Sequence, residues 1–361
     1  MTDRLDARQR EVLGAVIVNY VVARTPVGSR TVSKARADGL SPATIRNTMA
    51  ELEEMGYLLQ PHTSAGRIPT DLGYRYYVDS MMSGKPLTAV ESRAIRSALP
   101  GADEHPRVEE LLQRTVKLLA DLSLQVGVVL APRFTSAILR RLDFHRLPDG
   151  RILAVFVSES GIVDHKLITS SVPLSDTELV TISNMVNQNF HGKTLPRIRA
   201  ELIDQMRREK ALYDRLLSEA LRLCRSYLDE RADDDDEVIV GGTSNVVGEE
   251  GFADVDGMRA LFRAFEDKNR LVHLLNACLG EDRTQIRIGS ECHDPMFSAV
   301  TVISSPYRYR DRAVGALGIV GPRRMPYDRL VTLVDSLSTF LSDALALRNG
   351  VTSTKGASHG G

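Results

Sequence analysis

The stretch PVGSRTVSKARADGLSPATIRNTMAELEEMGYLLQPHTSAGRIPTDLGYRYY, residues 26–77, sets the organisation of the N-terminal part of the chain. Its middle predicts a helix that begins at Ser41, because a serine oxygen can cap the first turn and Pro42 suits the first helical position. Gly56 supplies the left-handed residue that commonly ends a helix. The apolar residues that recur at helical spacing, and so predict its buried face, are Ile45, Met49, Leu52 and Met55.

The outer face of the first two turns of this helix carries Thr44, Arg46 and Asn47. A helix that enters the major groove of DNA reads bases with its N-terminal residues: arginine can bond guanine, asparagine can bond adenine, and a threonine methyl can touch thymine. The side-chain types therefore suit base contacts. Exposed helix starts in general carry the same residue types, so an ordinary surface helix stays an open alternative.

A shorter helix is predicted just before it, over residues 29–37, where Arg30, Lys34 and Arg36 face no acidic residue. Such cations suit contacts with DNA phosphates, which position a protein but do not specify a sequence. The whole chain is near neutral, with 46 basic and 47 acidic residues, which is unusual for a DNA-binding protein. Between residues 27 and 50, however, four basic residues stand against Asp38 alone, and a local excess is enough to engage phosphates.

A β-hairpin is predicted next, with a strand over residues 57–59, a loop over residues 61–66, and a return strand that starts at Ile68 and ends at Pro69. Two helices followed by a hairpin with a basic tip form the layout of a winged-helix DNA-binding domain, although a plain surface hairpin is the alternative. A wing could lay Arg67 on the DNA backbone or in the minor groove. The residues expected to contact DNA are Arg30, Thr31, Lys34, Ser41, Thr44, Arg46, Asn47, His62, Ser64 and Arg67.

Two parts of the chain resemble a known family. The run SPATIRNTMAELEEMGYLLQPHTSAGRIPTDLGYRYYVD, residues 41–79, resembles the N-terminal domain of the bacterial heat-inducible transcription repressor HrcA. The runs SNVVG (244–248), IRIGSE (286–291) and VGALGIVGPRRMPYDRLVTLVDSLS (314–338) resemble the C-terminal domain of the same family. The resemblance implies an α+β fold, in which an N-terminal winged helix-turn-helix domain precedes a GAF-like mixed α/β domain that is interrupted by a helical dimerising insertion.

The pattern along the chain fits this order. Residues 108–126 predict an amphipathic helix, and three strands between residues 141 and 168 are joined by turns short enough for an antiparallel meander. Residues 195–228 predict a long helix whose apolar stripe would pack on its own domain or on a copy of itself. We expect a winged-helix domain over 1–83, a linker over 84–106, the first part of a GAF-like domain over 107–174, an inserted dimerisation domain over 175–237, the second part of the GAF-like domain over 238–349, and a disordered tail over 350–361.

No motif for catalysis is present, since the sequence lacks the P-loop, the His-Glu-x-x-His zinc motif and the Gly-x-Ser-x-Gly nucleophile elbow. Residues 291–294 combine metal-ligand types, but adjacent side chains point apart, so we expect a structural loop there. Arg323 and Arg324 could bind an anion or an acidic group of a partner, or could be surface charge. We therefore expect a protein that is not an enzyme and that has no cofactor and no metal.

The three cysteines, Cys224, Cys278 and Cys292, are odd in number and widely spaced, which favours buried thiols in a reducing compartment. No signal-peptide core and no membrane-length apolar run is found, so we expect a cytoplasmic protein without membrane contact. The resemblance implies a homodimer that binds an inverted repeat in double-stranded DNA, represses chaperone operons of the groE and dnaK type, and is kept active by the GroEL chaperonin. The alternative is a winged-helix regulator whose GAF-like domain senses a small-molecule ligand.

Overall fold

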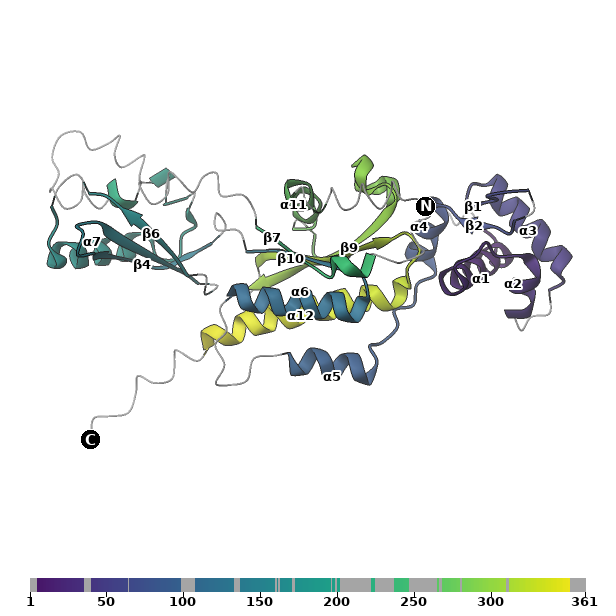
Figure 1. Ribbon diagram of the computed structural model, residues 1–361, viewed down its shortest axis with the longest axis horizontal. Coiled ribbons are helices and arrows are strands. Elements are labelled where there is room, and N and C mark those ends of the chain that lie inside the picture. The colour runs from purple at the N-terminus through teal and green to yellow at the C-terminus, as the bar shows by residue number, and fades with distance from the viewer. Residues whose placement is uncertain are drawn as a thin grey trace.

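The structure is a computed structural model, and it describes residues 5–35, 40–63, 65–98, 108–132, 137–159, 161, 163–170, 173–195, 197–198, 200–201, 222–224, 237–246, 265, 268–279, 281–309 and 312–350. The chain forms three units in a row (Figure 1). An N-terminal unit of helices and a hairpin lies at one end, a unit built on a five-stranded sheet occupies the centre, and a unit built on a three-stranded sheet lies at the other end. Helices and antiparallel sheets together confirm the expected mixed α+β class.

The N-terminal unit contains three helices, a two-stranded hairpin and a fourth helix. Their bounds are α1 Ala7–Ala23, α2 Ser29–Ala35, α3 Pro42–Glu54, β1 Leu58–Leu59, β2 Ile68–Pro69 and α4 Asp71–Ser80. Asp6 caps α1 through a capping box with Gln9, and Thr70 caps α4. Leu13, Ile17 and Tyr74 are among the fully buried side chains that join these helices into one core.

Helix α3 begins and ends as its sequence predicts. The Ser41 side chain accepts the backbone N–H of Thr44 at 3.1 Å, Pro42 takes the first helical position, and Gly56 adopts a positive φ of 81°. The core prediction is wrong for Met55, which is 39% exposed because it caps the helix beyond its last full turn.

The expected linker over 84–106 contains a helix, α5 Ala89–Ser97. Thr88 and Glu91 form a capping box at its start, and Ile95 is buried in the same core as the central unit. Glu91 also accepts a hydrogen bond from Nε of Arg329 at 2.7 Å. The expectation of a linker is therefore wrong for residues 89–97. The Thr-x-x-Glu capping signal at Thr88 and Glu91 could have predicted this helix.

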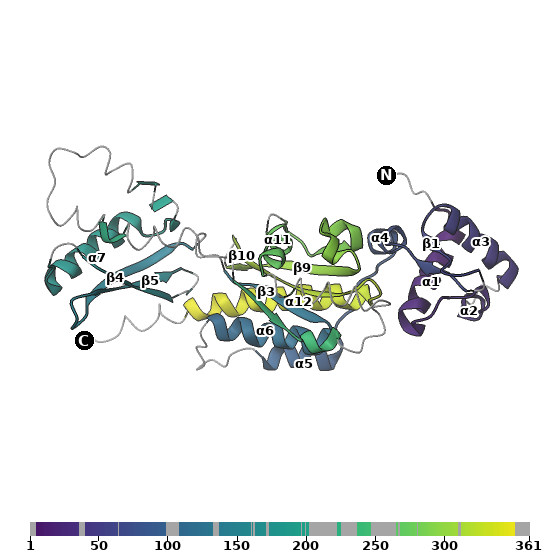
Figure 2. The same ribbon diagram turned by 45° about the horizontal axis from the view of Figure 1, so that its top comes forward.

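The central sheet has the strand order β7-β3-β10-β9-β8, and all its neighbours are antiparallel. The bounds are β3 Val126–Leu130, β7 Val238–Gly241, β8 Gln285–Ile288, β9 Val300–Tyr309 and β10 Arg312–Pro322. Helices α6 Val108–Ser123 and α12 Tyr327–Gly350 cover one face, and α11 Lys268–Asn276 lies on the other (Figures 1 and 2). The sequence prediction ran α6 on to residue 126 and missed β3, because its apolar run continues that of the helix.

The third unit contains the strands β4 Leu139–Arg146, β5 Ile152–Ser158 and β6 Val163–Ile168, with α7 Asp176–Phe190 packed on them. Asn187 of α7 bonds both backbone groups of Leu142, at 2.8 and 3.1 Å, along the edge strand β4. The three strands form a sheet of their own and do not pair with the central sheet. They lie between β3 and β7, in a part of the chain that precedes the insertion expected over 175–237.

Several expectations fall on residues outside the described ranges. These are most of the helix over 195–228 and the tail after residue 350. Within the residues that are described, no helix is long and apolar enough to cross a membrane.

Candidate nucleic-acid interface

The outward face of α3 carries the side chains predicted to read bases. Ile45, Thr48, Met49 and Leu52 are buried on the inner face of the helix. Arg46 and Asn47 are exposed, and among the described residues neither side chain makes a hydrogen bond or ion pair. Two outward polar groups near the start of this helix are therefore available to an outside ligand.

The hydroxyls at the start of α3 serve the helix itself. The Ser41 and Thr44 oxygens lie 3.0 Å apart, and the Ser41 oxygen also accepts the Thr44 N–H as the cap. The Ser41 side chain is exposed and that of Thr44 is half-buried. Both could still meet a phosphate at the helix start, where the backbone N–H groups and the helix dipole favour an anion.

Helix α2 adds further cations beside α3. Arg30, Thr31 and Lys34 are exposed on α2, and Val32 is buried under it. The Ser33 hydroxyl donates to the carbonyl of Leu40 at 3.0 Å, which ties the end of α2 to the start of α3. The two helices thus present their outward side chains on one rigid support.

Two of the three acidic residues of α3, Glu51 and Glu53, have partners within the unit. Glu51 accepts a hydrogen bond from Gln9 of α1 at 3.0 Å, and Glu53 pairs with Arg67 of the hairpin at 2.8 Å. Glu53 also accepts the backbone N–H of Gln60. The first half of α3 therefore carries an unpaired cation, whereas in its second half Glu51 and Glu53 are held against neighbouring elements and Glu54 is exposed.

The hairpin is fixed to the helices and has a constrained loop. The Gln60 amide donates to the carbonyls of Thr63 and Ala65, and Val27 and Arg67 exchange two backbone hydrogen bonds of 2.9 Å each. His62 is exposed near the tip, whereas Ser64 lies outside the described residues. The Arg67 side chain is only 17% exposed and is turned toward Glu53, so its contact with DNA stays a prediction.

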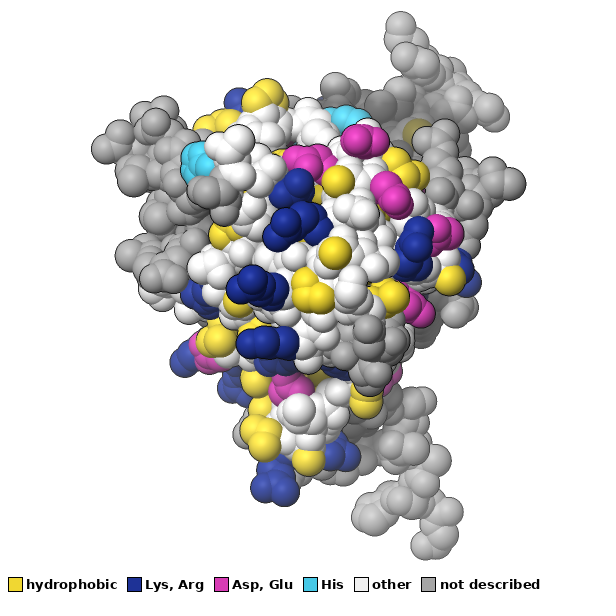
Figure 3. All heavy atoms as spheres, turned by 90° about the vertical axis from the view of Figure 1, so that its right-hand side faces the viewer, with side chains coloured by type: hydrophobic (Ala, Val, Ile, Leu, Met, Phe, Trp, Pro, Cys, Tyr) yellow, Lys and Arg dark blue, Asp and Glu magenta, His cyan; other side chains and the backbone are white. Residues whose placement is uncertain are grey.

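The end-on view shows how charge is distributed over this end of the molecule (Figure 3). Lys and Arg side chains run down the face, and most of the Asp and Glu side chains in view lie above and to the right of them. A run of cations that outnumber the acids beside them suits contact with a nucleic-acid backbone.

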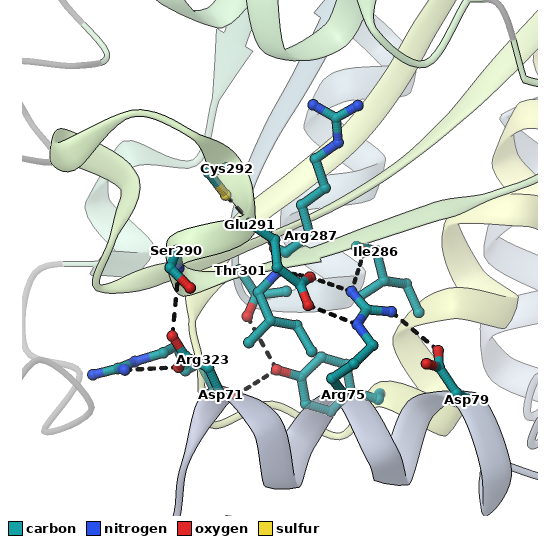
Figure 4. A network of polar contacts seen from close by, with 12 residues as sticks. Asp71, Arg75, Asp79, Ile286, Arg287, Ser290, Glu291, Cys292, Thr301 and Arg323 are labelled. Carbon is teal, nitrogen blue, oxygen red and sulfur yellow. Dashed lines mark hydrogen bonds and ion pairs between the residues drawn. The ribbon is translucent and has the colours of Figure 1, made fainter. Parts of the chain in front are cut away.

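A second cluster of charges, which the sequence did not reveal, joins α4 to the central unit (Figure 4). Arg75 donates to both carboxylate oxygens of Glu291 and, at 2.6 Å, to the carbonyl of Ile286. Asp71 pairs with Arg323 at 2.8 Å, and the Tyr77 hydroxyl donates to Asp328 at 2.7 Å. We refer to this set of contacts as the α4 contact.

The structure gives the two arginines before α12 partners within the chain, which neither of the alternatives left open for them foresaw. Arg323 pairs with an acid of its own chain, and Arg324 lies over the Tyr20 ring at 5.7 Å from its centroid. No local sequence pattern could have revealed the α4 contact. Arg75 and Asp79 have the spacing of an ordinary i, i+4 surface pair, and Glu291 is 216 residues away from Arg75.

The electrostatics of the α4 contact favour its charged form. Burial by itself raises the pKa of Glu291, but the hydrogen bonds from Arg75 and from the Ile288 N–H outweigh burial and leave the pKa below the ordinary range of a glutamate. The pKa of Arg75 is raised by its bond to Glu291. Both groups are therefore ionised at neutral pH, as a stable ion pair needs.

No metal or thiol chemistry is found in the described part of the chain. It contains no group of three or more His, Cys, Asp or Glu side chains arranged to hold a metal ion. The three cysteines are free and buried, and burial raises the pKa of the Cys292 thiol to about 12. These thiols are consequently protonated and unreactive at neutral pH.

Comparison with known proteins identifies the family. The family described as HrcA protein C terminal domain matches residues 109–331. Proteins called heat-inducible transcription repressor HrcA are 41% identical in Geobacter sulfurreducens, over 96% of this chain and 99% of theirs, and 40% identical in Syntrophobacter fumaroxidans, over 94% and 97%. The chain belongs to the HrcA family. A third HrcA protein, from Thermodesulfovibrio yellowstonii, is 33% identical over 95% of this chain.

The HrcA family is thus one of heat-inducible transcription repressors, and the sequence resemblance to it is confirmed. A crystal structure described only as a hypothetical protein has the same fold, with a TM-score of 0.62 at 22% identity over 96% of this chain and all of that chain. This solved fold extends through all three units.

Proposed function

We propose that this chain is a transcription repressor that binds double-stranded DNA through α2, α3 and the hairpin. The observation that carries the proposal is the separation of charge on α3, where Arg46 and Asn47 face outward unpaired while Glu51 and Glu53 are held by Gln9 and Arg67. Membership of a family of transcription repressors supports the choice of this outward, unpaired face as the DNA-binding face.

In this proposal the N-terminal unit acts as a winged helix. Helix α3 enters the major groove, with Arg46 and Asn47 reading base edges, because these side chains can each make two hydrogen bonds to one base. Arg30, Thr31 and Lys34 lie against phosphates, as do Ser41 and Thr44 at the start of α3. The hairpin is the wing, and His62, Ser64 and Arg67 meet the DNA backbone or the minor groove.

The functional form that we propose is a homodimer on an inverted repeat. A two-fold dimer presents two copies of α3 to two half-sites, so an operator that mirrors this symmetry is required. The central unit would be the GAF-like domain of the family, and the unit between β3 and β7 would provide the dimer contact. Its position at the end of the molecule away from α3 leaves the DNA-binding face clear (Figure 1).

The genes that we propose as targets are chaperone operons of the groE and dnaK type, and the proposed partner is the GroEL chaperonin. Family membership supports both. In this mechanism heat diverts the chaperonin to unfolded proteins, the repressor loses the help that keeps it active, and transcription rises. Such a repressor works in the cytoplasm, where bacterial operators are.

The test is binding of the purified full-length protein to a labelled inverted repeat from upstream of a chaperonin operon, compared with a scrambled duplex at two salt concentrations. We expect dimers on the repeat, with an affinity that falls steeply as salt rises. Equal affinity for both duplexes, with and without added chaperonin, would exclude a sequence-specific repressor.

A further inference from the structure

A cavity lies on the side of β8 away from the α4 contact. It has a volume of about 570 Å³ and is lined by α11, β8 and the turn after β8, which contains the 3-10 helices η3 Gly289–Cys292 and η4 Pro295–Phe297. Its polar lining comes from Arg270, His273, Arg287, Cys292, His293 and Asp294, and Leu274 adds an apolar wall. The volume falls in the range of pockets that hold small organic ligands, roughly 300–1,000 Å³.

The charged residues that line this cavity are two arginines and one aspartate. Arg270 pairs with Asp294 at 2.6 Å, and Asp294 also accepts the backbone N–H of Met296. The Arg287 guanidinium makes no ion pair or hydrogen bond with the described residues, although it is half-buried. His273 and His293 are exposed at the cavity. Glu291 lies close enough to interact with Arg287 electrostatically but does not hydrogen-bond to it. The guanidinium donors, beside two imidazoles, are therefore available to an anion that accepts two hydrogen bonds at once.

The strand alternation explains why Arg287 is directed into the cavity. Successive side chains of β8 point to opposite faces of the sheet, so Ile286 and Arg287 face different ways. Figure 4 shows Arg287 extending to the side opposite Arg75. Arg75 itself bonds the carbonyl of Ile286.

The same short segment therefore has two sides with different partners. On one side Glu291 holds Arg75 of α4, and its carboxylate also accepts the Ile288 N–H at 2.9 Å. On the other side Cys292 and His293, the next residues, line the cavity. Any ligand that shifts η3 changes the geometry of the α4 contact, and by linkage the α4 contact changes the affinity for that ligand by the same factor.

We propose that this cavity binds a small anion that carries a phosphate or carboxylate group, with Arg287 as its main ligand, and that its occupancy is transmitted through η3 to α4. Arg270 and the two histidines complete the polar side, and Leu274 accepts an apolar part of the ligand. The inference concerns the central unit and does not depend on the proposed DNA-binding function.

The first test is calorimetric titration of the full-length protein with inorganic phosphate and, separately, with citrate, at constant ionic strength set by chloride. We expect saturable binding of at least one of the two, and which one binds identifies the chemical group. Arg287→Gln should weaken it about tenfold or more, because it removes the bidentate charge. The matched control is Arg283→Gln, which removes an exposed arginine before β8 that does not line the cavity.

The variant Arg287→Lys separates folding from binding, because it keeps the charge and loses only the planar fork. It should bind with intermediate affinity, and all three variants should unfold at the wild-type temperature. Absence of saturable binding of both anions to the wild type, or equal binding by Arg287→Gln, would overturn the proposal.

The second test follows backbone hydrogen exchange in α4 with and without the bound anion. We expect the exchange rates of residues 71–80 to change on binding in the wild type. They should stay constant in Arg75→Ala, which cannot form the ion pair with Glu291. Unchanged exchange in the wild type at saturating anion would refute the transmission through η3. Neither test uses DNA, so a failure here is distinct from a failure of the repressor proposal.

Discussion

The cations of α2 and α3 and the cations of the α4 contact are of the same residue types, but their surroundings differ. Arg75 and Arg323 are matched by Glu291 and Asp71 within the chain. Arg46 on α3 has no such match among the described residues. The comparison shows that one chain uses some cations to hold its units together and leaves similar cations without a partner at its surface.

The cost of each arrangement explains the difference. An unpaired cation on a surface gains no stabilising contact within the folded protein, so it is free to serve solubility or an outside ligand. A paired cation in a partly buried contact is satisfied and cannot serve a ligand without breaking the pair. Substitutions on the two surfaces should therefore change different measured quantities.

The largest effect on the paired side is expected from Gly289→Ala. An added Cβ would overlap the Asp71 carboxylate, and Gly289 has a positive φ of 54° that disfavours other residues. We expect a loss of about 2 kcal/mol in the free energy of unfolding. Urea unfolding followed by tyrosine fluorescence measures it. Gly28→Ala is the control, since an added Cβ there meets no atom within 4 Å, and equal midpoints for the two variants would contradict the prediction.

An effect of similar size, on affinity rather than stability, is expected from Asn47→Ala on the unpaired side. Removal of a base-reading side chain should cost about 1–3 kcal/mol of affinity for the operator and relax the preference at one base pair. Stability should stay within about 0.5 kcal/mol of wild type, because the side chain is exposed. Titration against a set of single-base operator variants checks this. Gln113→Ala, an exposed amide on α6, should change neither quantity.

Glu291→Gln should have a smaller effect, and one that depends on pH. The pKa of Glu291 is lowered in the folded protein, so its ion pair stabilises the fold at pH values above the ordinary pKa of a glutamate. This stabilisation is lost as the pH falls through the lowered pKa. Partial exposure limits the effect at pH 7 to about 1 kcal/mol. Unfolding curves of variant and wild type should therefore differ at pH 7, begin to approach each other near the ordinary glutamate pKa of about 4.3, and converge only below the lowered pKa of the folded protein. A difference that stays constant down to pH 3 would argue against this origin.

Lys34→Ala should weaken binding to all duplexes alike. A single phosphate contact contributes about 0.9 to the slope of log K against log salt concentration, so the slope should become shallower by about that amount. Operator and scrambled duplexes, measured at four salt concentrations, provide the comparison. A loss confined to the operator would instead place Lys34 at a base.

The smallest effect is expected from Glu53→Gln. This variant tests Arg67, which is paired within the chain and is also a predicted DNA contact. The variant breaks the partly exposed ion pair between Arg67 and Glu53, so the free energy of unfolding should fall by about 0.5 kcal/mol or less. Affinity for any duplex should rise slightly if the released side chain reaches the DNA. Unchanged affinity would leave Arg67 as a structural residue of the hairpin.

Local signals in the sequence accounted for much of the N-terminal unit. Ser41, Pro42 and Gly56 mark the limits of α3 because caps and left-handed positions depend on neighbouring residues only. The outward position of Arg46 and Asn47 followed from helical periodicity. The predicted DNA contacts themselves remain predictions.

Partners far apart in the sequence could not be derived in the same way. Short turns correctly paired β4, β5 and β6 with one another, but they carry no information about which sheet the three strands join. Strand β3 was hidden because an apolar run buried on both faces has no period of its own. The α4 contact depends on residues more than 200 positions apart, so it required the structure.

The position of β3 and β7 as neighbours has a consequence for how the protein folds during synthesis. The backbone N–H of Ala131 bonds the carbonyl of Glu237 at 2.8 Å, so more than a hundred residues leave and re-enter the central sheet at one point. The sheet cannot be completed until its last strand, β10, has been made, because β10 lies between β3 and β9. The N-terminal unit and the β4–β6 unit, whose contacts are mostly local, can form first. A newly made chain would thus expose the apolar strand β3 for most of its synthesis, which makes the central unit the part of this protein most dependent on protection from aggregation.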